Sequence, residues 1–519
     1  MKKEIFYLTM MFLLFFTISY TYSTFKNTII GNINANINNW VFKANVTNGI
    51  LYNDGYKLKL NGSSGFININ LNTIGGNKAV DYSIELIGDN SIKYYEDSNY
   101  TKLINNNIYN STISSNTSNT TTIYYKCDKS LNIDIIIKIK ANHHIFVYGV
   151  KRNTNSTSTA WERINDSVSL VANAVKPDNT NPKNDFDSIY PWSDIKSYNY
   201  NASTKEITAW FGDANFKFDG TNGEVLTYIP GFYYKREVID DIEYQYISKE
   251  NQKGFSYSES FSVGRYKISG GKDAYNGSGL SSGNATDFIA KSKSGVYPSA
   301  SSTITIFRKS ARNLGDEFSL MDYHFFIIQL LYLVEYADYD SQTLLGKGNT
   351  NNAYNGAVIM GGTNDIGMKS GCILDDEKHS MIYRGIEDIY GNALEFIDGI
   401  NIKNYQLYIN YDYTTYISNI FSGKYQPLSY VNSSDDGYIT KIGYDSNNPL
   451  IGIPTKVNSN NVGSIKDYNF TSKNDSTTLR IGGNFSDSFG FRAGLWCTLI
   501  GLSYDKVDDG TSSRLIRHH

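Results

Sequence analysis

The chain has 519 residues, a formal net charge of -3, 40% hydrophobic residues and 19% charged residues. One hydrophobic core rarely serves a chain of this length, so we expect two or three globular domains. The nearly balanced charge supplies no basic face, and we therefore exclude nucleic acid as a partner.

The first 23 residues have the layout of a secretory signal peptide. Lys2 and Lys3 precede an apolar run at residues 5–18, and Thr21 and Ser23 place small residues at positions -3 and -1 of a cleavage site. An apolar run of about 14 residues is too short for a membrane span. We expect cleavage after Ser23 and a secreted or cell-surface protein without a stable membrane span; an uncleaved N-terminal anchor is the alternative.

Tyr and Phe are abundant, at 43 and 26 residues, and they stand between turn-forming Asn, Asp, Ser and Gly, which favours a β-rich fold. Residues 65–71, 82–87, 133–139 and 144–150 alternate polar and apolar side chains, so residues 27–153 are predicted to form an antiparallel β-sandwich. The order of these runs resembles the jelly-roll accessory modules of bacterial surface and polysaccharide-degrading proteins. That resemblance implies either a spacer, which we favour, or a sugar-binding module.

The cysteines and one pair of adjacent histidines are candidates for metal or redox chemistry. Cys127, Cys372 and Cys497 are an odd number at long spacings and form neither a disulfide framework nor a metal pattern, so we expect buried thiols and at most one pair. His143 and His144 are adjacent on a predicted strand, and their side chains point to opposite faces. We predict no metal and no cofactor.

Residues 154–187 are polar, contain Pro177 and Pro182, and are predicted to be a linker. The composition then changes, and residues 188–519 are predicted to form one domain. Its motifs, in chain order, are YPWS at 190–193, GDANFKFDGTNG at 212–223, IPGFYYK at 229–235, GIEDIYGNALEFIDG at 385–399, RIGGNF at 480–485, GFRA at 490–493 and SRLI at 513–516.

This series resembles the phage-tail and prophage receptor-binding proteins whose C-terminal domain has the C-type-lectin fold of the formylglycine-generating enzymes, the sulfatase-modifying factors. The resemblance implies an α+β, β-rich chain in which a C-type-lectin-like ligand-binding domain follows the sandwich. Ala393, Leu394 and Phe396 stand where this family usually has tryptophans around its Gly-Asn turn, and such apolar replacements preserve a packing role.

One long helix is predicted at residues 318–336, where Phe326, Leu330, Leu333 and Val334 recur at helical spacing and Asp322 can cap the N-terminus. His324 has no second ligand at the following helical turn, so we expect it to pack or to cap rather than to bind a metal.

An enzyme is the alternative that the resemblance raises. The formylglycine-generating branch of the fold uses two cysteines near the C-terminal strands, one of them usually after GFR, and here that position is Ala493. A carbohydrate-active enzyme would need two separated carboxylates around a cleft. The acidic runs at residues 375–377 and 508–509 are typical of solvated loops instead. We predict no catalytic residues.

Residues 479–517 alternate short segments predicted to form the frame, at 480–483, 490–494 and 513–516, with bulky or polar residues, as expected for binding loops on a rigid support. We predict a non-enzymatic adhesin or receptor-binding protein whose ligand is a protein or glycan on a cell or host surface. The predicted contact residues are Asn484, Phe485, Ser486, Asp487, Trp496, Thr498, Tyr504, Asp505, Lys506 and Asp508. The alternative for Phe485 and Trp496 is a place in the core. In the resembling family this segment is in some members diversified by a retroelement, and phage-tail relatives are often homotrimers, which adds avidity.

Overall fold

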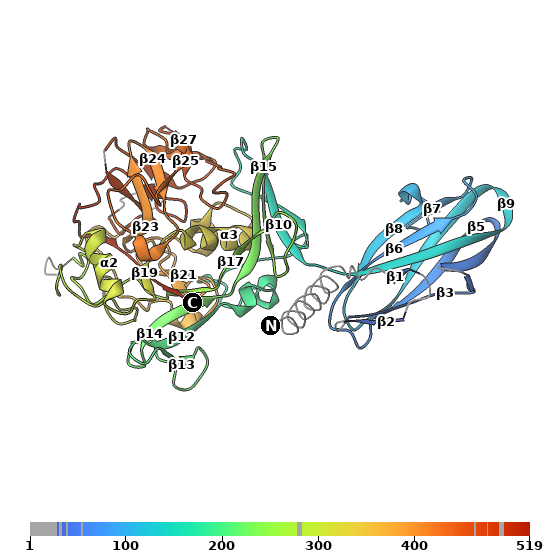
Figure 1. The fold of residues 1–519 in the computed structure, drawn as a ribbon, viewed down its shortest axis with the longest axis horizontal. Helices are drawn as coiled ribbons and strands as arrows, with labels where there is room; N and C mark the ends of the chain where they lie inside the picture. Colours follow the sequence, from blue (N-terminus) through green and yellow to red (C-terminus); the bar gives the residue numbers. More distant parts are fainter. Residues whose placement is uncertain are drawn as a thin grey trace, which may run out of the picture. The chain divides into compact units, whose positions relative to one another are not determined.

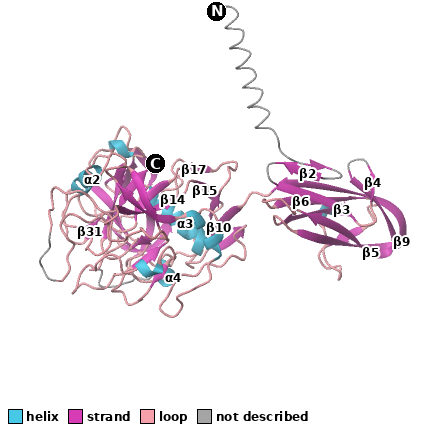
Figure 2. Ribbon diagram, turned by 90° about the horizontal axis from the view of Figure 1, so that it is seen from below, coloured by secondary structure: helices cyan, strands magenta, loops and turns pink. Residues whose placement is uncertain are grey.

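The computed structural model describes residues 29–30, 34–37, 40–52, 55–277, 283–460, 463–474, 476–486 and 492–519. It divides into two compact units, Met1–Ile145 and Phe146–His519. Both are built mainly from antiparallel strands, with few helices (Figures 1 and 2), so the predicted β-rich α+β class is confirmed. The predicted signal peptide lies outside the described residues. Within the described ranges no helix is both long and apolar enough to cross a membrane.

Two long strands, β5 (Gly55–Asn72) and β9 (Ser118–His143), form the frame of the first unit (Figure 1). They pair along their length with a bulge between Gly62 and Ser64, where Gly62 has a φ of 84°. The buried positions of β5 change from even to odd numbers across this bulge, so the hairpin turns a different face inward on each side.

The two halves of β9 belong to opposite layers of a β-sandwich. Tyr82 on β6 (Val80–Ile87) pairs with Ala141 near one end of β9, yet its hydroxyl lies 2.7 Å from Oγ1 of Thr121 near the other end. The predicted antiparallel sandwich is therefore present. Its remaining strands are β1 (Ile29–Ile30), β2 (Asn34–Ile37), β3 (Trp40–Val46), β4 (Ile50–Tyr52), β7 (Lys93–Tyr95) and β8 (Ile108–Ile113).

The described residues of the second unit form four sheets. The first comprises β10 (Val147–Asn153), β11 (Glu162–Asn165), β15 (Phe232–Ile239), β16 (Ile242–Ser248) and β17 (Ser256–Ser258). The second comprises β12 (Lys196–Asn201), β13 (Glu206–Trp210), β14 (Glu224–Ile229), β18 (Phe261–Gly264), β19 (Phe318–Leu320) and β32 (Leu515–His518).

The third sheet is small and comprises β20 (Gly371–Cys372), β21 (Met381–Tyr383) and β22 (Ile386–Glu387). The fourth comprises β23 (Leu394–Lys403), β24 (Gln406–Ile409), β25 (Gln426–Val431), β26 (Gly437–Ile442), β27 (Pro454–Asn458), β28 (Tyr468–Phe470), β29 (Thr477–Ile481), β30 (Thr498–Leu499) and β31 (Thr511–Ser512). Ala393, Leu394 and Phe396 are buried at the start of β23, as their expected packing role requires.

The long helix α3 (His324–Tyr336) is buried at each of its residues, so its apolar side chains face protein on all sides. It is shorter than predicted, because Phe318–Leu320 form strand β19 and pair with the C-terminal strand β32. Asp322 Oδ1 accepts the backbone N–H of His324 at 3.1 Å and lies 2.6 Å from Nδ1 of the same histidine. The N-cap residue of α3 is Tyr323, which makes no side-chain cap hydrogen bond, so the prediction that Asp322 is the cap is wrong; its carboxylate instead accepts the first N–H of the helix from one residue further out. The other helices described are α2 (Ile304–Arg312) and α4 (Ser341–Leu345).

The predicted boundary between sandwich and linker is wrong. Strand β10, which includes residues 147–153, pairs with β16 of the second unit. Residues 154–187 also belong to that unit, because Trp161 and Phe186 are buried in its core and Asn184 Nδ2 donates to Glu335 at 2.7 Å. A few large apolar side chains anchor this segment although its composition is polar.

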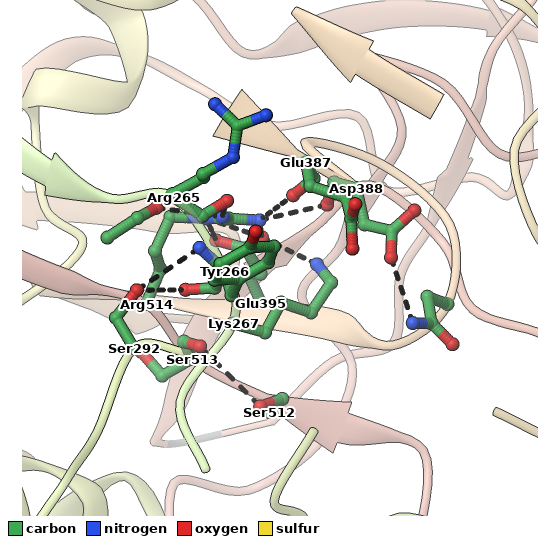
Figure 3. A network of polar contacts seen from close by, with 12 residues as sticks. Arg265, Tyr266, Lys267, Ser292, Glu387, Asp388, Glu395, Ser512, Ser513 and Arg514 are labelled. Carbon is green, nitrogen blue, oxygen red and sulfur yellow. Dashed lines mark hydrogen bonds and ion pairs between the residues drawn. The ribbon is translucent and has the colours of Figure 1, made fainter. Parts of the chain in front are cut away.

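A buried polar network joins the second and fourth sheets (Figure 3). Arg514 Nη2 lies 2.7 Å from Glu395 Oε1, and Lys267 Nζ lies 2.5 Å from the same oxygen. Arg514 also donates to the carbonyl oxygens of Gly264, Arg265, Glu387 and Asp388 at 2.7–3.0 Å. Burial alone would raise the pKa of Glu395, but the charges of Arg514 and Lys267 hold it below its usual value.

Asp388 lies beside this network with one oxygen satisfied. Its Oδ2 accepts Ser380 Oγ at 3.1 Å and Asn392 Nδ2 at 2.9 Å, whereas its buried Oδ1 has no hydrogen-bond partner among the described residues. Burial, and then the charge of Glu387, raise the pKa of Asp388 to about 7.

The network makes Arg514→Met strongly destabilising. Removing the guanidinium leaves Glu395 buried with a single cationic partner, so we expect the unfolding free energy of the second unit to fall by about 3–5 kcal/mol. Urea denaturation followed by tryptophan fluorescence measures this change. The control is Lys309→Met, which breaks an exposed ion pair with Asp287 and should leave the midpoint nearly unchanged. Equal midpoints for the two variants would contradict the role given to Arg514.

Asp388→Asn tests the raised pKa of this carboxyl. Folded Asp388 keeps its proton up to about pH 7, whereas in the unfolded chain it ionises near its ordinary value of 3.8. The folded state therefore binds more protons between about pH 4 and 7, and the contribution of Asp388 to stability decreases as pH rises through that window. We expect the wild-type protein to lose stability relative to the Asn variant over this range in parallel urea titrations. A stability difference that is constant with pH would contradict the assignment.

Candidate ligand-binding surface

The predicted binding stretch begins on a rigid strand. Each residue of β29 is buried, and this strand pairs with β23 on one side and β30 on the other. Gly482 and Gly483 follow with φ values of 88° and 72°, a conformation that side chains disfavour, and here the chain leaves the sheet. A Cβ on Gly510 would lie 2.3 Å from Asn484 Nδ2, so glycine lets the loops at 484 and 510 approach.

Backbone hydrogen bonds join four loops that are distant in the sequence. The N–H of Asn352 donates to the carbonyl of Phe485 at 2.9 Å, and the N–H of Tyr275 donates to that of Asp509 at 3.1 Å. The N–H of Ala357 donates to the carbonyl of Tyr275 at 2.7 Å. Loops 274–277, 352–357, 484–486 and 508–510 therefore form one framework, which we call the loop surface together with the adjoining residues 503–507.

Six of the predicted contact residues reach solvent at the loop surface. Ser486, Asp505 and Lys506 are exposed, and Asn484, Tyr504 and Asp508 are partly exposed. Asn484 Oδ1 accepts the N–H of Ser486 at 3.0 Å and its hydroxyl at 2.7 Å, which fixes this turn locally. Asp487 lies outside the described residues.

Phe485, Trp496 and Thr498 are buried, and the prediction that they form part of an exposed contact surface is wrong. The Phe485 ring packs against Tyr275 at 6.1 Å. The Trp496 ring packs edge-on against Tyr339 at 4.8 Å, within the core that contains α3. Thr498 donates its hydroxyl to Asn469 Oδ1 at 2.8 Å. For Phe485 and Trp496 the alternative, a place in the core, is what the structure has.

Asp508 belongs to the support of the loop surface. Its Oδ2 pairs with the fully buried Arg480 and accepts the Thr511 hydroxyl at 2.9 Å, while its Oδ1 accepts the N–H of Gly510 at 3.1 Å. These bonds commit the carboxylate to holding the loop, so Asp508 has few acceptor positions left for a ligand.

Two of the exposed residues of the loop surface that were not predicted have large apolar side chains. Tyr354 is 89% exposed, and Val507 is 47% exposed. Tyr354 is an aromatic residue between turn-forming residues in the run NNAYNG at 351–356. The same pattern predicts binding loops within residues 484–508. The sequence does not show that this run lies beside residue 485. The structure does, because the backbone N–H of Asn352 donates to the carbonyl of Phe485.

The cysteines are placed for packing. Cys127, Cys372 and Cys497 are buried, as predicted, and no disulfide joins any two of them in the described part of the chain. Burial raises the pKa of the Cys372 thiol to about 11, the opposite of what a reactive thiolate needs. Within the described ranges, no three His, Cys, Asp or Glu side chains are grouped to hold a metal ion.

No protein-family model and no curated protein sequence matches this chain. The resemblance to phage-tail receptor-binding proteins, drawn from the motifs between residues 190 and 516, stays a prediction. The loop surface therefore has to be interpreted from its geometry and its side chains.

Trp496→Ala should act on stability. Removing a buried indole from the core typically costs about 3–5 kcal/mol of unfolding free energy, and we expect a loss of that size in urea denaturation. Asp505→Ala, on the exposed part of the same chain segment, serves as the control and should leave the midpoint nearly unchanged. A Trp496→Ala variant as stable as the wild type would show that the indole does not support the fold.

Proposed function

We propose that the chain is an exported, non-enzymatic adhesin or receptor-binding protein that presents the loop surface to a protein or glycan on a cell. The observation that carries this proposal is the exposure of Tyr354, Asp505 and Lys506 on or beside loops that backbone hydrogen bonds hold to one framework. A preformed surface loses little conformational entropy when it binds.

The chemistry of these side chains suits recognition. An exposed tyrosine buries a large area with few rotatable bonds, and short polar or charged groups around it select the partner. Hydrogen-bond donors and acceptors are supplied next to the rigid frame by Asn484 and Ser486, and one negative and one positive charge by Asp505 and Lys506. This mixture fits a protein or glycan surface and lacks the basic field that nucleic acid requires.

Further support comes from the sequence. The signal-like residues 1–23 favour export, and the motifs from residue 190 onward resemble phage-tail receptor-binding proteins. In the same proposal the first unit acts as a spacer, and a homotrimer would add avidity to weak single contacts. Ala493 at the position after GFR and the buried thiol of Cys497 favour binding over oxidase chemistry.

Alanine substitution at the loop surface tests the proposal. We expect the combined variant Tyr354→Ala, Asp505→Ala, Lys506→Ala to lower binding to target cells at least tenfold, because central aromatic residues and charged neighbours often dominate such interfaces. Flow cytometry with the labelled full chain measures binding, after an array of glycans and surface proteins has selected the target.

The matched control is Tyr257→Ala, which removes an exposed tyrosine from β17 in a different sheet and should leave binding intact. Both variants should keep the melting temperature of the wild type within a few degrees. Unchanged cell binding by the folded triple variant would remove the loop surface from the proposal.

A further inference from the structure

A polar pocket lies outside the loop surface. Its volume is about 320 Å³, and charged or polar side chains line it: Asp340, Gln342, Lys347, Asp375, Lys466 and Asp467. They come from the N-terminal end of α4, from the segments around residues 347 and 375, and from the residues just before β28. This volume is enough for a small polar ligand or for the end of a larger one.

Most charges around the pocket are already paired. Asp340 forms an ion pair with Lys466, and its Oδ1 caps α4 by accepting the N–H of Thr343 at 3.1 Å. Lys347 Nζ lies 2.8 Å from Glu377 Oε1. These groups can orient a ligand, but each has a partner in the absence of one.

Asp375 is satisfied in the same way. It accepts the backbone N–H of Lys347 at 2.8 Å, and its other oxygen lies 3.1 Å from Lys176 Nζ.

Asp467 differs from the other carboxylates. It is only 2% exposed, and none of the described lysines or arginines forms an ion pair with it. Its Oδ2 accepts the N–H of Trp496 at 2.7 Å. A Cβ on residue 494 would lie 2.1 Å from Asp467 Oδ1, so Gly494 leaves the space that this carboxyl occupies.

A buried carboxyl without a cationic partner is costly to ionise. Burial raises the pKa of Asp467 well above its usual value, and the charge of Asp340 raises it further. Tyr390 interacts electrostatically with this carboxyl, but its hydroxyl donates to the carbonyls of Ser341 and Gly346. A ligand that brings positive charge to Asp467 would supply the missing partner.

We propose that this pocket binds a primary ammonium group and that Asp467 is the carboxylate that receives it. An ammonium group offers three N–H donors, and a carboxylate has about four acceptor positions; the backbone N–H groups of Trp496 and Cys497 use two of those of Asp467 and leave about two for a ligand. Each of the other charged groups in the lining already has an ion-pair partner, so Asp467 is the lining group that a cation can pair with. The pocket is independent of the proposed adhesin function, because none of the exposed residues of the loop surface lines it.

Two sources carry this chemistry, an amino sugar and a lysine side chain. Isothermal titration calorimetry of the full chain at pH 7 should use methyl glucosaminide and Nα-acetyl-lysinamide as probes. The matched controls are the same compounds with the amine acetylated, which keeps the body of the ligand and removes its charge. We expect at least one amine to bind and its acetylated form to bind at least tenfold more weakly. Which amine binds identifies the source.

Two variants test the residues. Asp467→Asn keeps an acceptor for the N–H of Trp496 but removes the charge, and we expect affinity for the amine to fall about ten- to hundredfold. Thr343→Phe fills the pocket from the exposed side of α4, leaves Asp467 in place, and should also abolish binding. Thr204→Phe, on an exposed turn elsewhere, is its control.

Three results would overturn the proposal. The first is that neither amine binds the folded wild-type chain. The second is that the acetylated compounds bind as well as the amines, and the third is that both pocket variants retain full affinity. Each holds whether or not the loop surface binds cells.

Discussion

The buried ion pair between Arg514 and Glu395 fixes the end of the chain, and the loop surface depends on that anchor. Glu395 lies on β23, which pairs antiparallel with β29 and in parallel with β31. The loops at 484–486 and 503–510 leave from these two partner strands. Arg514 lies two residues after the end of β31, and its guanidinium donates hydrogen bonds to four carbonyl oxygens besides the carboxylate of Glu395. The recognition segment is thus attached at both ends to a desolvated, hydrogen-bonded core.

A second anchor repeats this arrangement nearer the surface. Arg480 is buried on β29, and its guanidinium holds Asp508 while also donating to the carbonyl of Lys506 at 3.3 Å. The loop that carries Asp505 and Lys506 is therefore attached to the strand beneath it. Rigidity of this kind separates the residues that hold the loops from those free to meet a partner. Within residues 479–517, burial separates many of the described residues into these two groups, and hydrogen bonding assigns the partly exposed Asp508 to the support.

The general fold was predictable because half-buried strands alternate polar and apolar side chains, and β5, β6 and β9 do so clearly. Helix α2 was not predicted, since its first residues, Ile304, Thr305 and Ile306, are β-branched and favour strands locally. The polar composition of residues 154–187 predicts a linker, because composition does not reveal that Trp161 and Phe186 pack into a core formed by residues far away in the sequence. A local sequence pattern predicts local structure only. For helix α2 and for residues 154–187, packing against residues distant in the sequence determines the structure.

The errors in the predicted site have the same cause. An aromatic residue between turn-forming residues is found both in binding loops and in cores, so the sequence could not distinguish Trp496, which is buried, from Tyr354, which is exposed. The sequence does not predict a role for Asp467, because that role depends on a pocket formed by α4 and distant loops. The polar frame residues, by contrast, stand in recognisable motifs, and the positions predicted for the frame at 480–483 and 513–516 are buried in the strands or beside them.

The most direct test of the central claim is hydrogen–deuterium exchange on the full chain, free and bound to a cell-envelope preparation that retains it. The account predicts that binding slows exchange in peptides covering residues 352–357, 484–486 and 503–509, while α3 and β29 exchange slowly in both states. Protection confined to the first unit, with no change in those three loops, would contradict the claim that the C-terminal loops form the binding surface.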